Sequence, residues 1–430
     1  MRRVLVIGSG GREHAIVWKL SGSPLLEKLF CAPGNPGTAT LATNLDADIK
    51  NFSSIASAVK ENKIDMVVVG PEDPLVNGLR DFFEADSDLA NVVFIGPGRE
   101  GAKLEGSKEY AKAFMERWGI PTAGYKSFGK EDIGSAYDFL DTLQAPYVLK
   151  ADGLAGGKGV VIPTNLESAR MELATMLDGK FGDAGKRVVI EEYLHGIELS
   201  VFVLTDGKDY LILPEAKDYK RIGEGDTGLN TGGMGAVSPV VFADAAFMKK
   251  VEDRIVKPTV DGLRKDNIPY KGFIFIGLMN CGGEPFVIEY NVRMGDPETE
   301  AVMPRIESDL LGHFVALGEG RLGGEKVIHS SKSALTIVAV SGGYPEHFEK
   351  GYPLEITAAV EEDTLLFHSG TRKENGMVVS AGGRVMAVTA LADSLNAARE
   401  KAYRGVSGVS FKDIYFRRDL GLDLLNFKNN

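Results

Sequence analysis

The segment KADGLAGGKGV, residues 150–160, follows an apolar run and places a series of glycines around Lys158. It differs from a Walker A loop, because Gly159 instead of serine or threonine follows Lys158, and Asp152 stands at the first glycine position. Each lysine can attract a phosphate charge at about 4 Å by roughly 4 kcal/mol in an effective dielectric near ~20. The segment therefore predicts a strand followed by a mobile, phosphate-binding flap. The alternative is a glycine hairpin with solvated lysines.

Upstream of this segment, the first hundred residues alternate short apolar runs with amphipathic stretches. The runs are VLVIG (residues 4–8), KLFCA (28–32), MVVVG (66–70) and VVFIG (92–96), and a glycine or proline turn ends each of them. This alternation predicts a parallel, doubly wound sheet that is buried on both faces. Because such sheets bind ligands at the carboxyl ends of their strands, we expect these turns to line a site.

The first of these turns, in VLVIGSGGREHA, allows two functional interpretations. A dinucleotide-binding motif needs a small residue where Glu13 stands, and an acidic residue about 20 positions later, where the second strand ends in Ala32-Pro33. The motif is therefore disfavoured. In the other interpretation, free N–H groups at a helix start hold a phosphate, and Arg12 and His14 add charge and a donor. A tight turn without a ligand is the structural alternative.

The segment RVVIEEYLHGIELS is predicted to be a strand that leads into a short connector. Such a connector offers backbone groups to the edge of an adenine, here near Glu191 and Leu194. Glu198 can accept hydrogen bonds from ribose hydroxyls. The segment can equally be the end of a surface strand, but its position after the lysine-containing strand favours a nucleotide site.

The segment VIEYNVRMGDPETE, residues 287–300, alternates polar and apolar residues. In a strand, Glu289 and Asn291 share a face, and two hard oxygen ligands suit Mg²⁺, which completes its shell with phosphate and water. Arg293 continues on this face as a cation for a transferring phosphoryl group. Polar side chains in a strand of this kind are costly without a ligand, which argues against a purely structural role.

The glycine-rich segment DYKRIGEGDTGLNTGGMGA, residues 218–236, has no regular periodicity. It is predicted to be a long irregular loop, and such loops inside compact enzymes are usually functional. Asp218 can pair with a substrate ammonium group, and Lys220 or Arg221 can pair with an anion.

The composition excludes several classes of protein. The chain has 430 residues, of which 44% are hydrophobic, and a net charge of −11 with a pI near 5.3. General binders of nucleic acids or anionic membranes carry a basic surplus instead. No run of about 20 apolar residues is present, and the first apolar run stops at a glycine turn, unlike a signal peptide. We therefore expect a cytoplasmic protein without nucleic-acid or membrane partners.

The pattern of segments predicts an α/β and α+β protein in three parts. The N-terminal doubly wound parallel-sheet domain is expected over residues 1–103, and an α+β domain over residues 331–430. The central region, residues 104–330, is strand-rich and includes a smaller lobe at about 122–192 that carries the glycine flap. The chain length agrees with this division, since a domain has about 150 residues.

Taken in order, these segments resemble the ATP-grasp superfamily and, within it, the glycinamide ribonucleotide synthetase (phosphoribosylamine–glycine ligase) family. GGREHA, TGGMGA and GDPET are more specific than a generic ATP-grasp loop, and the matching pieces span the chain. The resemblance implies a central ATP-grasp fold of two lobes that binds ATP and Mg²⁺ (or Mn²⁺). It further implies that ATP phosphorylates glycine and that the amine of 5-phosphoribosylamine attacks the glycyl phosphate. A monomer or weak homodimer is expected.

The resemblance also assigns roles to residues at the matching positions. ATP would contact Lys108, Lys150, Gly156, Gly157, Lys158, Glu191, Leu194 and Glu198. The metal ligands would be Glu289 and Asn291. The substrates would contact Gly10, Gly11, Arg12, Glu13, His14, Asp218, Arg221, Gly295, Asp296, Pro297 and Glu298. The catalytic residues would be Arg293, Asp218 and Lys158.

The sequence departs from the family pattern at several positions. The family form reads S-Q-D-H-K-R where this chain has AKDYKR, and it has phenylalanine at Met294 and glutamine at Glu300. These departures leave the roles of Lys217, Tyr219 and Glu300 unassigned, whereas Asp218 keeps its place.

Three other functions compete with this prediction. A sister ATP-grasp ligase or carboxylase acting on another small carboxylate would keep the glycine flap, but need not have GGREHA or TGGMGA. A Rossmann oxidoreductase would need glycine or alanine at Glu13. A non-catalytic ATP-binding regulator would be expected to lose metal ligands or phosphate-binding lysines, and this chain has them all.

Overall fold

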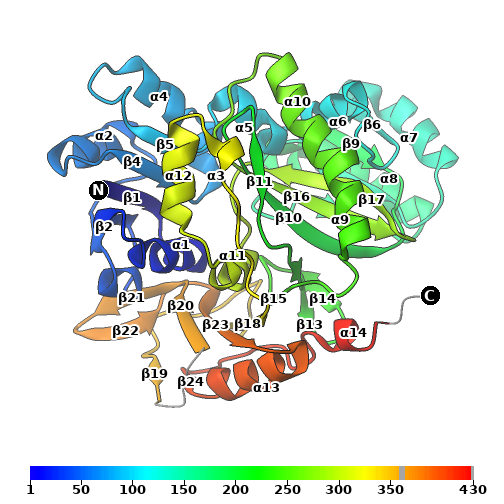
Figure 1. The fold of residues 1–430 in the computed structure, drawn as a ribbon. Coiled ribbons are helices and arrows are strands. Elements are labelled where there is room, and N and C mark those ends of the chain that lie inside the picture. The colour runs from blue at the N-terminus through cyan, green and yellow to red at the C-terminus, as the bar shows by residue number, and fades with distance from the viewer. Residues whose placement is uncertain (358–363, 428–430) are drawn as a thin grey trace.

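The computed structural model describes residues 1–357 and 364–427. Its N-terminal part, blue in Figure 1, is the predicted parallel sheet, with strands in the order β3-β2-β1-β4-β5. The strands are β1 Arg2–Gly8, β2 Leu26–Pro33, β3 Thr43–Asn44, β4 Met66–Val69 and β5 Val93–Ile95. The four predicted strands are confirmed. The short edge strand β3 was not predicted, because its two polar residues form no apolar run.

Helices cover both faces of this sheet, which explains its uniformly apolar strands. Val4 and Val6 share a core with α1 (Gly11–Ser21) and α12 (Leu310–Gly318), whereas Leu5 faces the opposite core. The helices of that opposite face are α2 Phe52–Glu61, α3 Glu72–Val76, α4 Leu79–Ala85 and α5 Arg99–Gly106. Because α12 comes from late in the chain, distant segments complete the N-terminal core.

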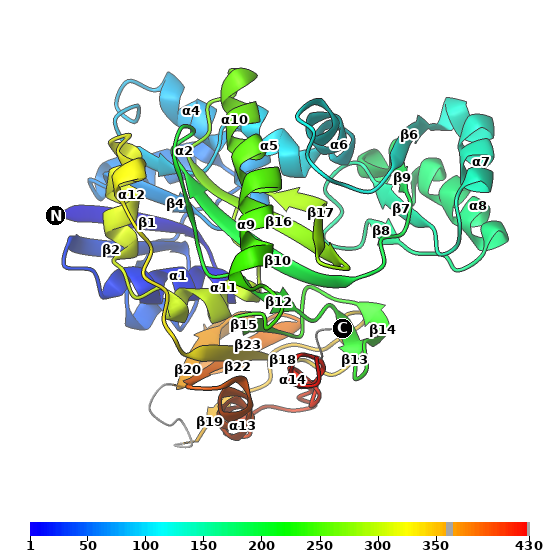
Figure 2. The same cartoon turned by 45° about the vertical axis from the view of Figure 1, so that its right-hand side comes forward.

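A small lobe projects from the body of the molecule (Figure 2). Its antiparallel sheet has the order β6-β9-β7-β8, and α6 leads into it from the body. Leu149, Leu173 and Ile190 belong to a core whose residues all come from this lobe. The elements are α6 Lys108–Arg117, β6 Tyr125–Gly129, α7 Ile133–Thr142, β7 Val148–Ala151, β8 Val160–Val161, α8 Leu166–Thr175 and β9 Arg187–Glu191. The lobe is therefore a separately packed unit.

The large lobe is built on an antiparallel sheet in the order β11-β10-β16-β17. Val201 and Ile276 on one face share a core with helices α9 and α10, which lie across the sheet in Figure 1. The elements are β10 Ile197–Thr205, β11 Tyr210–Ile212, α9 Ala245–Val251, α10 Lys257–Lys265, β16 Gly272–Cys281, β17 Glu284–Asn291 and α11 Glu298–Val302. The strand β17 carries the predicted metal ligands at its end.

The C-terminal part combines a sheet in the order β12-β15-β18-β23-β20 with helix α13 packed against it. Its elements are β18 Ser333–Val340, β19 Glu355–Ile356, β20 Thr364–His368, β21 Thr371–Glu374, β22 Met377–Ser380, β23 Arg384–Ala392, α13 Leu395–Val406, β24 Val409–Ser410 and α14 Leu422–Leu425. The strands β12 (Lys217–Asp218) and β15 (Gly235–Ser238) reach this sheet from the central region. The sheet therefore joins two stretches of sequence.

The prediction of an irregular loop over residues 218–236 is wrong. Besides β12 and β15, this segment contains the hairpin β13 (Arg221–Gly223) and β14 (Thr227–Asn230). These strands have two to four residues and several glycines, so they show no apolar alternation. They are held instead by backbone pairing of β15 with β18 and by side chains from the end of the chain.

The predicted fold class is confirmed by these three parts. A parallel α/β sheet is followed by a two-lobed central region and an α+β unit. Among residues 1–357 and 364–427, no helix is long and apolar enough to cross a membrane.

Candidate active site

A buried carboxylate between two lysines lies where the two lobes meet. Lys150 Nζ is 2.9 Å from Glu191 Oε1 and donates to the Ile288 carbonyl at 3.0 Å, while Lys112 Nζ is 3.0 Å from Glu191 Oε2. All three charged side chains are at most 4% exposed. Burial lowers the pKa of Lys112 to about 8. The Glu191 side chain is thus occupied in holding Lys150 and Lys112.

The glycine flap is fixed at its base and open at its tip. The Asp152 carboxylate accepts from the Ser107 hydroxyl at 3.0 Å and from the Glu109 N–H at 2.8 Å, at the start of α6. Lys108 Nζ donates to the Gly153 carbonyl at 3.2 Å. At the tip, Gly156 and Gly157 have φ of 56° and 76°, and an added Cβ at either would meet nothing within 4 Å. Lys158 is exposed at this tip. The flap can therefore move without disturbing its anchor.

Glu289 and Asn291 lie on β17 and point to the same side of the strand. Lys108 and Lys220 both act electrostatically on Glu289. The described part of the chain has no group of three His, Cys, Asp or Glu residues that could hold a metal. A carboxylate and an amide oxygen still fit Mg²⁺, since this ion commonly takes one or two protein ligands and completes its shell with phosphate and water.

Arg293 is held beside this pair by two acidic residues from different elements. Its guanidinium donates to Glu72 of α3 at 3.2 Å, to Glu105 of α5 at 2.8 Å and to Asn291 at 3.3 Å. Glu105 also accepts from the Val292 N–H at 2.7 Å. Burial raises the pKa of Glu105, whereas for Glu72 the attraction of Arg293 and Arg12, together with hydrogen bonds, outweighs burial and lowers the pKa. Arg293 is therefore a preorganised cation next to the oxygen ligands.

A second charged cluster follows strand β12. Lys220 Nζ lies 2.7 Å from Glu198 Oε2, and this attraction lowers the pKa of Glu198. Burial raises the pKa of Asp218, which neighbours the same lysine. Glu298 accepts from the Ser200 hydroxyl at 3.1 Å, and burial together with Asp218 raises its pKa to about 7. This cluster can accommodate an ammonium group and can take up a proton near neutral pH.

At the start of α1, Glu13 uses both carboxylate oxygens. The Gly10 N–H donates to Oε2 at 2.6 Å, and Arg12 Nε donates to Oε1 at 2.6 Å. An added Cβ at Gly8 would lie 2.5 Å from Glu13, and one at Gly70 would lie 2.0 Å from it. The Glu13 side chain therefore occupies the position where a dinucleotide-binding motif has a small residue. The Gly10 N–H is already bonded to this side chain.

Arg12 and His14 have different surroundings. Although burial would lower the pKa of Arg12, the carboxylates of Glu13 and Asp296 raise it, and its guanidinium donates to the Met294 carbonyl at 3.3 Å. His14 Nδ1 accepts from the His368 N–H at 2.9 Å, and burial lowers the pKa of His14 to about 3. Arg12 is thus a cation facing the GDPE turn, whereas neutral His14 joins α1 to strand β20.

Arg384 connects the GDPE turn to the TGGMGA segment. Its Nη1 is 2.9 Å from Asp296 Oδ1 and also donates to the carbonyls of Asp296 at 2.9 Å and Gly232 at 2.6 Å. An added Cβ at Gly233 would lie 2.3 Å from Pro297, and one at Gly295 would lie 2.5 Å from Glu298. The two segments approach each other closely, and only glycine allows this contact.

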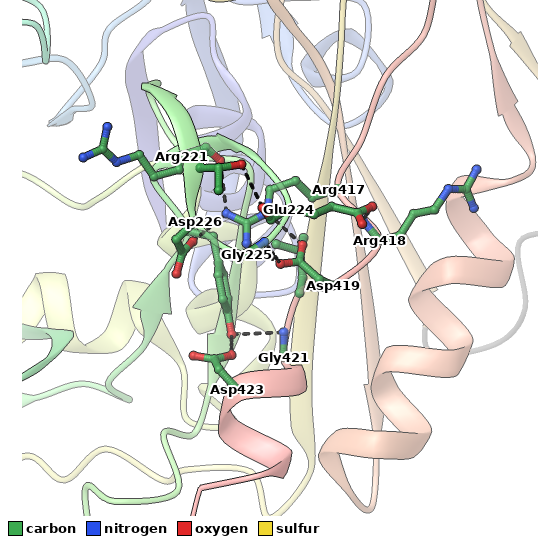
Figure 3. A network of polar contacts seen from close by, with 12 residues as sticks. Arg221, Glu224, Gly225, Asp226, Arg417, Arg418, Asp419, Gly421 and Asp423 are labelled. Carbon is green, nitrogen blue, oxygen red and sulfur yellow. Dashed lines mark hydrogen bonds and ion pairs between the residues drawn. The ribbon is translucent and has the colours of Figure 1, made fainter.

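Residues 417–423 bind the strand β12 and the hairpin that follows it along the chain (Figure 3). Arg417, only 1% exposed, lies 2.7 Å from both Asp226 and Asp419 and donates to the Arg221 carbonyl at 3.1 Å. The Tyr219 hydroxyl donates to Asp423 at 2.6 Å. We call residues 417–423, bound in this way to residues 217–226, the C-terminal clasp.

Along residues 217–220, side chains that contact the C-terminal clasp alternate with side chains that belong to the second charged cluster. Lys217 Nζ lies 3.1 Å from Asp423, so Lys217 and Tyr219 face the clasp, while Asp218 and Lys220 face the cluster. Lys217 and Tyr219, which the sequence left unassigned, thus anchor the strand between them.

Profiles of one protein family match the chain from end to end. The N domain of phosphoribosylglycinamide synthetase matches residues 2–105, its ATP-grasp (A) domain residues 106–299, and its C domain residues 334–423. The chain belongs to the phosphoribosylglycinamide synthetase family.

Individual relatives agree with this assignment. The phosphoribosylamine–glycine ligase of Rhizobium meliloti is 44% identical over 419 residues, which cover 97% of this chain and 98% of the relative. The bifunctional purine biosynthetic protein PUR2,5 of Pichia angusta is 45% identical, and this chain spans 53% of its length. The crystal structure of phosphoribosylamine–glycine ligase from Thermotoga maritima superposes with a TM-score of 0.85 at 33% identity, covering 97% of this chain and 99% of that one.

In this member of the phosphoribosylglycinamide synthetase family, most of the predicted site residues belong to the contacts described above. Two predicted residues stand apart. The Arg221 guanidinium donates to the Gly228 carbonyl at 2.8 Å within its own hairpin, and it points away from the clasp in Figure 3. In the described part of the chain, no side-chain contact joins it or Lys158 to the other predicted residues. Leu194 is half-buried in the connector between β9 and β10. Their roles stay predictions.

Several charged residues of this phosphoribosylglycinamide synthetase site were missed, among them Lys112, Arg384, Glu105 and Glu72. Lys112 falls on the apolar face of α6, beside Ala111 and Met115. A lysine on an apolar helix face could have indicated a buried ion pair. Arg384 lies in SAGGRVMAVTA, a segment used for the resemblance but given no role. Glu105 had no signal in the sequence, because its contact with Arg293 depends on the packing of α5.

Proposed function

We propose that this chain ligates glycine to 5-phosphoribosylamine at the expense of ATP, giving glycinamide ribonucleotide, ADP and phosphate in purine biosynthesis. The observation that carries the proposal is a series of charged clusters, from the Lys150–Glu191 pair to the Asp296–Arg384 pair, to which all three family domains contribute. Relatives that carry the name of this ligase match over their full length, which supports the same activity.

The nucleotide end of the site lies between the two lobes. Lys108 and Lys150 would contact the phosphates of ATP, and the open flap would bring Lys158 to them on closing. The backbone of Glu191 and the connector at Leu194 would hold the adenine, and Glu198 the ribose. A closed flap excludes water, which protects a reactive acyl phosphate from hydrolysis.

Phosphoryl transfer takes place beside β17 in this proposal. Glu289 and Asn291 would hold Mg²⁺ or Mn²⁺, which when bound offsets the negative charge of the ATP phosphates. Arg293, fixed by Glu72 and Glu105, stabilises charge on the phosphoryl group as the glycine carboxylate attacks it. The product of this step is glycyl phosphate.

The acceptor end comprises Asp218, the GDPE turn and the start of α1. Asp218 pairs with a substrate ammonium group, and Arg12 supplies a cation for the phosphate of 5-phosphoribosylamine. As the amine attacks the glycyl carbonyl, it loses a proton and phosphate leaves. Glu298 is suited to accept this proton, because its pKa of about 7 lies near the working pH.

The test is an ADP-release assay on the full chain with each substrate omitted in turn. We expect ADP release only when glycine and 5-phosphoribosylamine are both present. Equal turnover with bicarbonate or D-alanine in place of glycine would refute the assignment and favour a sister ATP-grasp enzyme. We also infer a cytoplasmic location and a monomer or weak homodimer, and light scattering tests the latter.

A further inference from the structure

Glu300 is a buried acidic residue without a hydrogen-bond donor. Its side chain on α11 is 0% exposed, and neither carboxylate oxygen has a hydrogen-bond partner in the described part of the chain. Glu300 Oε1 and the Ser369 hydroxyl converge on the first residue of α1. An added Cβ at Gly11 would lie 2.3 Å from the one and 2.6 Å from the other. The Glu300 side chain therefore lies directly against the start of α1.

The charged neighbours of Glu300 are already committed to other partners. Helix α11 packs against α1, β15, β18, β23 and the turn Met303–Arg305, and β15 and β18 carry no ionisable side chain. The ionisable side chains on the other elements are Arg12, Glu13, His14 and Lys19 of α1, Arg305 of the turn and Arg384 of β23. Arg384 is bonded to Asp296, Arg12 to Glu13, Lys19 to the Ile306 carbonyl and Arg305 to Ser238.

We propose that Glu300 is a positioning residue that acts as a neutral carboxylic acid, and that its proton bridges to Asp296 and holds the Asp296–Arg384 pair beneath the start of α1. The inference rests on the proposed function, because Asp296 and the start of α1 are placed at the phosphoribosyl end of the site. It assigns a role to a residue that differs from the family pattern, and the amide of glutamine would donate the same hydrogen bond.

The chemistry of the pair supports a shared proton. Glu300 and Asp296 both border the start of α1, with Glu300 against Gly11 and Asp296 beside Gly10, and two carboxylates have no donor between them unless one is protonated. Burial and the Asp296 charge raise the pKa of Glu300 well above its ordinary value, and Arg384 offsets this only in part. The start of α1 favours a negative charge, but its Gly10 N–H already serves Glu13.

The first test compares thermal unfolding of the ligand-free full chain with that of Glu300→Gln between pH 6 and pH 9. Because the folded-state pKa is raised, the wild type loses stability as pH rises through that pKa, whereas the amide cannot ionise. We expect the melting temperature of Glu300→Gln to gain at least about 2 °C on the wild type across this range. The control Glu84→Gln, at a residue whose side chain is 59% exposed, should stay parallel to the wild type.

The second test measures kinetics in the reverse direction, from glycinamide ribonucleotide, ADP and phosphate. In the wild type, the KM for glycinamide ribonucleotide should rise by up to about tenfold per pH unit once Glu300 ionises, with little change in kcat. Glu300→Gln should keep the neutral-pH KM and lose this dependence. A pH profile shared by the wild type and Glu300→Gln would overturn the proposal.

The two tests separate this inference from the proposed function. Unfolding requires no substrate, so diverging melting temperatures without any ligase turnover would support the neutral acid and refute the function. Parallel melting curves with normal turnover would refute the neutral acid alone. If Glu300→Gln does not fold, Glu300→Met replaces it, and a wild-type pH dependence in that variant would equally refute the proposal.

Discussion

Two ammonium groups bind opposite oxygens of one buried carboxylate at Glu191. Glu191 is the shared counter-charge of both lysines, since a charge this deeply buried is costly unless it is paired. The sequence predicted Lys150 and Glu191 but gave them separate roles. It could not indicate their ion pair, because the pair depends on the register of β7 against β9, in which Val148 lies opposite Glu191.

Replacing Lys112 tests this buried triad. Lys112→Met leaves one oxygen of Glu191 unpaired, so we expect the free energy of unfolding to fall by about 3 kcal/mol. Urea denaturation at pH 8 measures the loss. The control is Lys103→Met, which removes an exposed pair with Glu100 and should cost less than about 1 kcal/mol.

The stability difference between the wild type and Lys112→Met should depend on pH. Burial depresses the folded-state pKa of Lys112 to about 8, below its unfolded value near ~10.4, so its contribution to stability is largest at high pH. That contribution is lost as pH falls through 8. The stability difference between wild type and Lys112→Met should therefore shrink from pH 10 to pH 8, and an unchanged difference would contradict the proposed environment.

Removing the Glu289 carboxylate should affect catalytic turnover more than folding. Glu289→Ala deletes the proposed metal ligand on a half-buried strand end, so we expect turnover to fall by at least about 10²-fold with a melting temperature near that of the wild type. Steady-state ADP release and thermal unfolding measure the two effects. Glu284→Ala, at the other end of β17, is the matched control and should keep activity. A large drop in melting temperature without ligand would indicate a structural role instead.

At the scale of elements, the C-terminal clasp shows how a short, glycine-rich hairpin is kept in place. The ladder between β13 and β14 contains few paired residues, and its outer side is held by Arg417 and Asp419. The sequence predicted a role for Asp218 but not the strand that carries it. Period-two alternation, the signal for strands, cannot appear in segments of two to four residues.

Removing the clasp arginine should loosen this hairpin selectively. Arg417→Met leaves Asp226 and Asp419 without their shared cation, so amide hydrogen exchange in residues 221–230 should speed up. The KM for the amine substrate should rise about tenfold, because Asp218 and Lys220 lose their support. Arg418→Met is the control, since the Arg418 side chain points away from the network in Figure 3. Equal exchange rates in the two variants would show that the clasp does not position the hairpin.

At the scale of the whole molecule, the small lobe can move as a unit, because the residues of its hydrophobic core all come from this lobe. The hydrophobic cores of the other parts contain residues from more than one part. Without nucleotide, trypsin should cut after Lys158 at the exposed tip of the flap. ATP with Mg²⁺ should slow this cleavage by at least about tenfold, because closure buries the tip against phosphate. Cleavage after Lys186, exposed elsewhere in the lobe, provides the internal reference. Protection of both sites to the same degree would indicate general rigidity rather than flap closure.

The sheet that pairs β15 with β18 has a consequence for modularity. A fragment that starts near residue 331 keeps β18, β20 and β23 but loses β12 and β15, and this exposes the backbone of an apolar strand to self-association. The C-terminal part therefore cannot be exchanged between relatives as a cassette cut at that point. A split enzyme, a circular permutant or a chimera would have to transfer residues 217–238 together with the C-terminal part. Recombination between relatives is therefore expected to keep these two stretches of sequence together.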